Sequence, residues 1–180
     1  MSIIYGERIR LRAPEREDIP LFLKWFNDPE VTITLFNYLP LSLVEEENWF
    51  DEMIKSPAEE HPLTIEVKEK NGWKAVGNTA FITINWIARS AEIGIAIGEK
   101  DYWNQGYGTE AMKLMLKHGF ETLNLNRIYL RVYEFNKRGI RAYEKTGFVH
   151  EGCMRQALHK QGRYHDVLFM SVLREEWEKS

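Results

Sequence analysis

The chain has 180 residues, of which 44% are hydrophobic and 28% are charged, and these values predict one globular domain spanning residues 1–180. Its formal net charge is -3 without a block of like charges, so we expect no nucleic-acid partner. No apolar run is long enough for a signal peptide or a membrane span, and we therefore expect a cytoplasmic protein without a membrane partner.

The N-terminal part of the chain predicts one strand and two helices. Ile9–Arg12 alternates apolar and basic residues, as in a short strand. A helix follows through the apolar positions between Leu21 and Phe26, and Asn27-Asp28-Pro29 ends it. Ser42 and Glu45 form a capping box, which predicts the start of a second helix.

Strands dominate the middle of the chain. Leu63–Lys68 and Trp73–Ile84 are rich in β-favouring residues and are joined across Asn71-Gly72, a strong turn signal, so they predict a hairpin. A third strand is predicted over Ala91–Ile97.

The second half of the chain alternates between helices and strands. A buried stripe through Met112, Met115, Leu116, Phe120 and Leu123 predicts a long helix. The elements predicted in order are this helix from Gly106, a strand over Arg127–Val132, a short helix over Asn136–Lys145 and a strand over His165–Leu173. The predicted fold class is α+β, with a mostly antiparallel sheet packed by about four helices.

The loop from Asp101 to Ala111 joins a strand to a helix and contains two glycines. Amide groups at a helix N-terminus have no intrahelical partner and bind anions such as a pyrophosphate, although a glycine-assisted turn has the same residues. Gly106-x-Gly108-x-x-Ala111 also fits a dinucleotide fingerprint, but the acidic residue that the fingerprint requires about 20 residues later is absent. A Walker motif is absent too.

Two motifs together resemble the coenzyme motifs of the GNAT acetyltransferase superfamily. The first is Trp103-Asn104-Gln105-Gly106-Tyr107-Gly108, and the second runs from Asn136 to Phe148. Ala91-Glu92-Ile93-Gly94 and Tyr143-x-x-x-Gly147-Phe148 resemble the branch that contains RimJ/RimL-type ribosomal-protein acetyltransferases and spermidine N-acetyltransferases. The resemblance implies a GNAT-like acyl-CoA N-acyltransferase fold, with a mostly antiparallel mixed sheet of about seven strands flanked by about four helices.

The same resemblance implies residues that bind acetyl-CoA as a co-substrate. It assigns backbone pairing with the pantetheine arm to Ile95, Ala96 and Ile97, and a hydrogen bond with the coenzyme to Asn136. It assigns pyrophosphate binding to the amides of Asn104, Gln105, Gly106, Tyr107, Gly108 and Thr109. The family often has Gln or Arg where this chain has Trp103, so that side chain is not expected to supplement the phosphate site. A bulge is expected in the Ala91–Ile97 strand.

Two residues are candidates for catalysis. The resemblance places Tyr143 beside the coenzyme sulfur, and helical spacing puts it on nearly the same face as Asn136 and Ile140. Its phenolic O–H can protonate the leaving thiolate. Glu92 is the candidate base, direct or through water, because it lies on the small face of the predicted strand, and a cross-strand ion pair with Arg131 is an equal alternative.

The resemblance implies an acetyl-CoA-dependent N-acetyltransferase that acts on a small-molecule or peptide primary amine by direct attack in a ternary complex. Trp25, Phe36, Tyr38 and Trp86 are candidates for an apolar acceptor wall. The identity of the amine stays open, as does a homodimer. The alternative function is a catalytically silent CoA-binding sensor or interaction module of the same fold.

Cysteine and histidine carry no recognisable motif. Cys153 is the only cysteine, so it cannot form an internal disulfide, and nothing around it indicates a nucleophile. The five histidines contain no H-x-x-x-H pair, so we expect no metal site.

Overall fold

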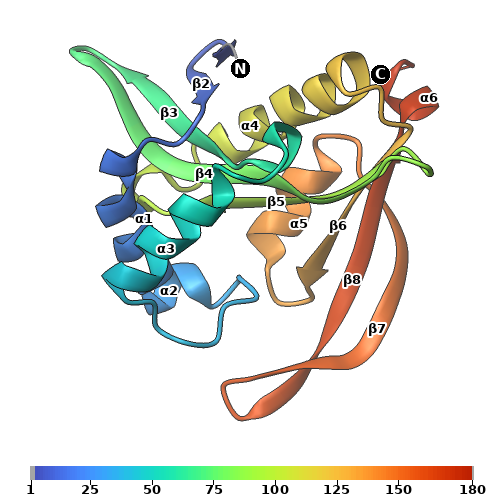
Figure 1. Ribbon diagram of the computed structural model, residues 1–180. Helices are drawn as coiled ribbons and strands as arrows, with labels where there is room; N and C mark the ends of the chain where they lie inside the picture. The colour runs from blue at the N-terminus through green and yellow to red at the C-terminus, as the bar shows by residue number, and fades with distance from the viewer. Residues whose placement is uncertain (1–2, 180) are drawn as a thin grey trace.

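Eight strands form one sheet in residues 3–179, the part of the chain that the computed structural model describes (Figure 1). In chain order they are β1 (Ile4–Tyr5), β2 (Ile9–Arg12), β3 (Leu63–Glu69), β4 (Gly72–Asn85), β5 (Ser90–Ile97), β6 (Arg127–Tyr133), β7 (Val149–Lys160) and β8 (Arg163–Leu173). Their order across the sheet is β1-β2-β3-β4-β5-β6-β8-β7, and of these neighbours only β5 and β6 are parallel. The sheet is therefore mixed and mostly antiparallel.

Six α-helices are found among the same residues. They are α1 (Ile19–Phe26), α2 (Pro29–Thr32), α3 (Leu43–Met53), α4 (Tyr107–Lys117), α5 (Lys137–Glu144) and α6 (Arg174–Trp177). A π-helical turn over His118–Thr122 extends α4. Figure 1 shows α4 on one side of the sheet and α1 and α3 on the other. No helix within residues 3–179 is long and apolar enough to cross a membrane.

The predicted fold class is confirmed, with one strand and two helices beyond the numbers expected. The additional elements are β1, α2 and α6, which have two, four and four residues. Segments this short contain too few positions for a hydrophobic period to emerge. Pro29 does follow the end of the first helix, but it also opens α2, where the Asp28 side chain accepts a hydrogen bond from the amide of Glu30.

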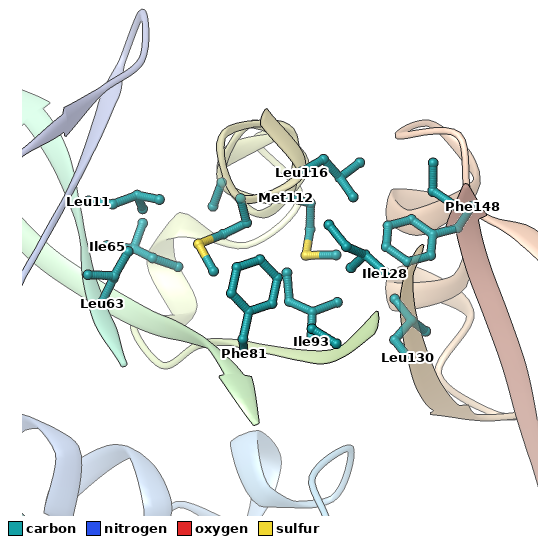
Figure 2. Close-up of a cluster of buried hydrophobic side chains, with 14 of the residues drawn as sticks. Leu11, Leu63, Ile65, Phe81, Ile93, Met112, Leu116, Ile128, Leu130 and Phe148 are labelled. Carbon is teal, nitrogen blue, oxygen red and sulfur yellow. The ribbon is translucent and has the colours of Figure 1, made fainter. Parts of the chain in front are cut away.

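The main core lies between α4 and the sheet. Met112, Met115 and Leu116 are fully buried on α4, and they belong to one cluster with side chains of the strands. Figure 2 shows Met112 and Leu116 directed toward Phe81, Ile93 and Ile128. The predicted buried stripe of this helix is confirmed through Phe120, and Leu123 packs partly buried against the same cluster. This core fixes β5 and α4 relative to each other.

The sheet opens between β5 and β6. These two strands pair only from Ser90 to Glu92 on β5, so the later residues of β5 have no strand partner on that side. The bulge expected in β5 lies instead in β4, where the register shifts between Phe81 and Thr83 opposite Ile93 and Glu92. The extra residue, Ile82, falls on β4 because β5 runs with regular alternation along the main core, where Ile93, Ile95 and Ile97 share one face.

Candidate functional site

A cavity of about 310 Å³ lies beside the unpaired end of β5. One wall of the cavity is the end of β5, a second is the loop before α4 with the first turn of α4, and a third is helix α5. The fourth wall is formed by α2 and the residues after it. The lining residues from the predicted set are Ile95, Ala96, Ile97, Asn104, Gly106, Tyr107, Gly108, Thr109, Asn136 and Tyr143. Two predicted residues, Gln105 and Glu92, do not line it.

The β5 wall presents backbone groups to the cavity. Ile95 and Ala96 lie beyond Glu92, the last residue of β5 that pairs with β6. The backbone N–H and C=O groups that point toward β6 are therefore available to an extended ligand in this part of β5. The carbonyl oxygen of Ile97 already accepts a hydrogen bond from the indole Nε1 of Trp103 at 2.7 Å. Trp103 therefore holds the end of β5 against the loop that follows.

The loop before α4 and the first turn of α4 line the cavity. Gly106 is the N-cap of α4 with φ +86°, and Asn104 also has a left-handed backbone with φ +60°. No side chain caps this helix start, so its first amides are not satisfied from within the helix. The N-terminal end of the helix dipole is favourable for an anion at this position.

Arg8 supports the same loop from outside the cavity. Its guanidinium donates to the carbonyl oxygen of Gln105 at 3.0 Å and to the carboxylate of Glu110 at 3.0 Å, and it stacks on the ring of Tyr107. The Gln105 side chain donates to the carbonyl oxygen of Asp101. Gln105 thus stabilises the loop through its neighbours and is turned away from the cavity.

Helix α5 contributes Asn136 and Tyr143. The side-chain oxygen of Asn136 accepts a hydrogen bond from the backbone amide of Gly139 at 2.9 Å and caps α5. The side-chain nitrogen of Asn136 is therefore left for a ligand. Tyr143 is half-buried next to Phe148, and desolvation by burial raises the pKa of its phenol to about 12. The phenol is therefore protonated at neutral pH. Ile140, predicted on the same face, is buried in the main core.

Basic residues on α5 form part of the cavity wall that sequence reasoning missed. Arg138, Arg141 and Lys145 line the cavity, and their spacing along the helix was the available signal. The Arg138 guanidinium lies 3.7 Å from the ring centroid of Trp103, and burial lowers its pKa. Within residues 3–179 no carboxylate pairs with Arg138. A cation without a counter-charge, beside uncapped helix amides, fits the phosphates of a coenzyme.

Glu92 forms the ion pair that the sequence offered as one of its two roles. Its Oε1 lies 2.7 Å from Nε of Arg131, and the Glu92 side chain is buried. Arg131 in turn stacks over the ring of Phe36. The pair lies on the face of β5 opposite the main core, outside the lining of the cavity.

The fourth wall comes from the segment after α1, and its residues were also missed. Val31, Thr34 and Leu35 line the cavity together with Ile95 and Tyr143. Among the aromatic candidates for an acceptor wall, Trp25 packs in one buried cluster with Val31 and Leu35 of this segment, and Phe36 contacts Tyr133 of β6. Four consecutive residues of α2 are too few to predict this wall from their pattern.

Comparisons with known proteins identify relatives of the chain. Residues 8–149 match the family described as an acetyltransferase (GNAT) domain. An uncharacterized N-acetyltransferase p20 of Bacillus licheniformis is 32% identical over 98% of this chain and 99% of its own length. A spermidine N(1)-acetyltransferase of Vibrio cholerae is 31% identical over 96% of both chains.

A solved structure supports the same relationship. The crystal structure of spermidine N-acetyltransferase from Vibrio cholerae in complex with CoA and spermine superposes with a TM-score of 0.88 at 29% identity. The superposition covers 96% of this chain and 99% of that chain.

Proposed function

The chain belongs to the GNAT acetyltransferase family, and on this premise we propose that it transfers the acetyl group of acetyl-CoA to a primary amine in a ternary complex. The observation that carries this proposal is the convergence of the end of β5, the first turn of α4 and Tyr143 on one cavity. The CoA bound to the Vibrio cholerae relative supports acetyl-CoA as the co-substrate.

Separate groups of the cavity suit separate parts of the coenzyme. The amides of Gly106, Tyr107, Gly108 and Thr109 suit the pyrophosphate, together with the guanidinium of Arg138. The backbone of Ile95 and Ala96 suits the amide groups of the pantetheine arm, because β6 does not pair with β5 there. When bound, acetyl-CoA supplies a thioester whose carbonyl carbon is attacked by the amine.

The transfer requires movement of two protons. The amine nitrogen bonds to the carbonyl carbon and loses a proton, and the C–S bond breaks to leave a thiolate that gains a proton, which yields an N-acetyl amine and the CoA thiol. A backbone N–H of β5 beyond Glu92 is suited to stabilise the oxyanion of the tetrahedral intermediate. The phenol of Tyr143 lines the cavity and, with its pKa raised to about 12, holds its proton at neutral pH, so it has a proton or hydrogen bond to give to the thiolate.

Glu92 remains our candidate for the group that receives the proton of the amine. Because its side chain does not line the cavity and already accepts a hydrogen bond from Arg131, we propose that the proton reaches it through water. The ion pair with Arg131 equally supports a purely structural role. Substitution of Glu92 by Gln separates these roles.

Release of CoA thiol tests the proposed function. Purified protein is mixed with acetyl-CoA and, separately, with pentylamine, phenethylamine, spermidine or a peptide with an unblocked N-terminus. We expect amine-dependent thiol release and an acetylated amine in mass spectra. Binding of CoA without turnover on any of these amines would contradict the proposal and favour a silent CoA-binding module.

A further inference from the structure

Lys160 connects the end of β7 to the cavity wall that Val31, Thr34 and Leu35 form. Its Nζ donates to the carbonyl oxygens of Thr32 and Leu35 at 2.6 and 2.7 Å, across more than 120 residues of sequence. Figure 1 shows that β7 and β8 form a long hairpin projecting from the sheet, and Lys160 lies at its tip. The hairpin therefore brings an ammonium group to the segment that follows α1.

The ammonium of Lys160 lies in a cage built for a cation. Two carbonyl oxygens accept from it, and the rings of Tyr38 and Tyr133 lie 5.7 and 5.5 Å from Nζ, within the range of a cation–π interaction. No carboxylate pairs with Lys160 in the described part of the chain, and burial lowers its pKa. The cage is thus occupied by a positive charge that no acidic side chain neutralises.

This charge lies directly behind one wall of the cavity. Leu35, whose carbonyl binds Lys160, lines the same cavity as Thr34, Ile95 and Tyr143. The neighbouring segment, residues 33–41, contains no Asp or Glu and exposes Phe36 and Leu39.

Acidic groups near this wall are already paired. None of the residues that line the cavity is acidic. Asp28 and Glu30 both pair with Lys100 at 2.8 Å, and Glu92 pairs with Arg131. A second ammonium on an acceptor would meet the charge of Lys160 without a carboxylate to compensate for it.

We propose that the acceptor is a monoamine with an apolar or aromatic body, and that Lys160 excludes acceptors carrying a second ammonium group. This inference rests on the proposed acetyl transfer and names the acceptor class of the same site. It differs from the polyamine in the name of the Vibrio cholerae relative.

Pentylamine and putrescine test the acceptor class in the wild-type protein. The two molecules have equal numbers of non-hydrogen atoms, and putrescine has an ammonium where pentylamine has a methyl group. We expect kcat/KM for pentylamine to exceed that for putrescine and for spermidine by at least about tenfold, ~1.4 kcal/mol. Equal or higher kcat/KM for spermidine would overturn the inference. Absence of thiol release with every amine would instead refute the proposed function itself.

Variants of Lys160 test its part in the selection. Lys160→Gln removes the charge and keeps an N–H donor for the two carbonyl oxygens. We expect kcat/KM for putrescine to rise, so that kcat/KM for pentylamine exceeds it by less than about threefold. Lys160→Arg should keep the preference. Arg155→Met is the matched control, because it removes an exposed positive charge from the same hairpin at a position that neither pairs with Lys160 nor belongs to the cage.

Calorimetric titration with CoA shows whether each variant keeps a folded coenzyme site. If Lys160→Gln fails this control, Lys160→Met replaces it with an apolar chain of similar length. A variant that binds CoA within about threefold of wild type, yet discriminates between the two amines as wild type does, would show that Lys160 is not the selecting residue.

Discussion

In the proposed reaction, Tyr143 protonates the leaving thiolate, and removal of its hydroxyl tests that role. Tyr143→Phe keeps the ring against Phe148 and should lower kcat by about 10²-fold, the scale of general-acid catalysis, with little change in CoA affinity. Because burial raises the pKa of the phenol to about 12, this loss should be constant between about pH 6 and 10. Tyr164→Phe, at an exposed position, serves as the control. Near-wild-type kcat in Tyr143→Phe would mean that the thiolate leaves without this acid.

Gly108 tests the position of the phosphate site. A Cβ atom at Gly108 would lie 3.6 Å from Ile97, an ordinary contact, so a side chain there is compatible with folding. Gly108→Asp places a negative charge where we expect the pyrophosphate and should abolish CoA binding. Gly108→Ala is the matched control and should bind CoA. Calorimetry decides the matter: an affinity of Gly108→Asp within about threefold of wild type would place the phosphates elsewhere.

Glu92→Gln separates a base from a structural ion pair. Glutamine can still accept the hydrogen bond from Arg131 but cannot take a proton from the amine, so we expect lower turnover and loss of the acidic limb of the pH profile. The affinity for CoA should persist. An unchanged pH profile together with a lower melting temperature would assign Glu92 to structure alone.

At the scale of elements, α3 contains a buried charge with a cost to stability. Glu46 is 5% exposed, its pKa is raised by burial, and within residues 3–179 no basic side chain pairs with it. Since the folded-state pKa exceeds the unfolded value, the stabilising effect of protonation is present at low pH and is lost as pH rises through the folded-state pKa.

Glu46→Gln should therefore stabilise the protein at pH 7 by about 1 kcal/mol, which raises Tm by about 2–4 °C in a chain of this size. The gain should disappear as pH falls through the raised pKa of Glu46, because Glu46 itself is then protonated. Glu47→Gln, on the exposed side of the same helix, is the control for thermal unfolding measurements. A lower Tm for Glu46→Gln at pH 7 would contradict this account.

The longer elements could be predicted because their signals are local. The capping box at Ser42 and Glu45 is present, and the stripe through Met112 and Leu116 is buried as expected. The cage around Lys160 could not be predicted, because it joins a hairpin tip to carbonyl oxygens of Thr32 and Leu35, and backbone acceptors leave no trace in side-chain patterns.

At the scale of the molecule, we propose that residues 1–180 form one domain. The main core draws residues from β2, β3, β4, β5, β6 and β8 together with α4 and α5, so no boundary separates the two halves of the sheet. The motifs in the sequence contain most of the residues that line the cavity, since these residues lie in continuous loops and helix starts. They did not predict the wall formed by Val31, Thr34 and Leu35, which depends on how distant segments meet.

The central claim is direct transfer of acetyl from acetyl-CoA to an amine, and initial-rate kinetics with both substrates varied test it most directly. A ternary complex predicts that thiol release requires both substrates and that the double-reciprocal lines intersect. Parallel lines, together with an acetylated protein in mass spectra after exposure to acetyl-CoA alone, would indicate a covalent intermediate and contradict the account.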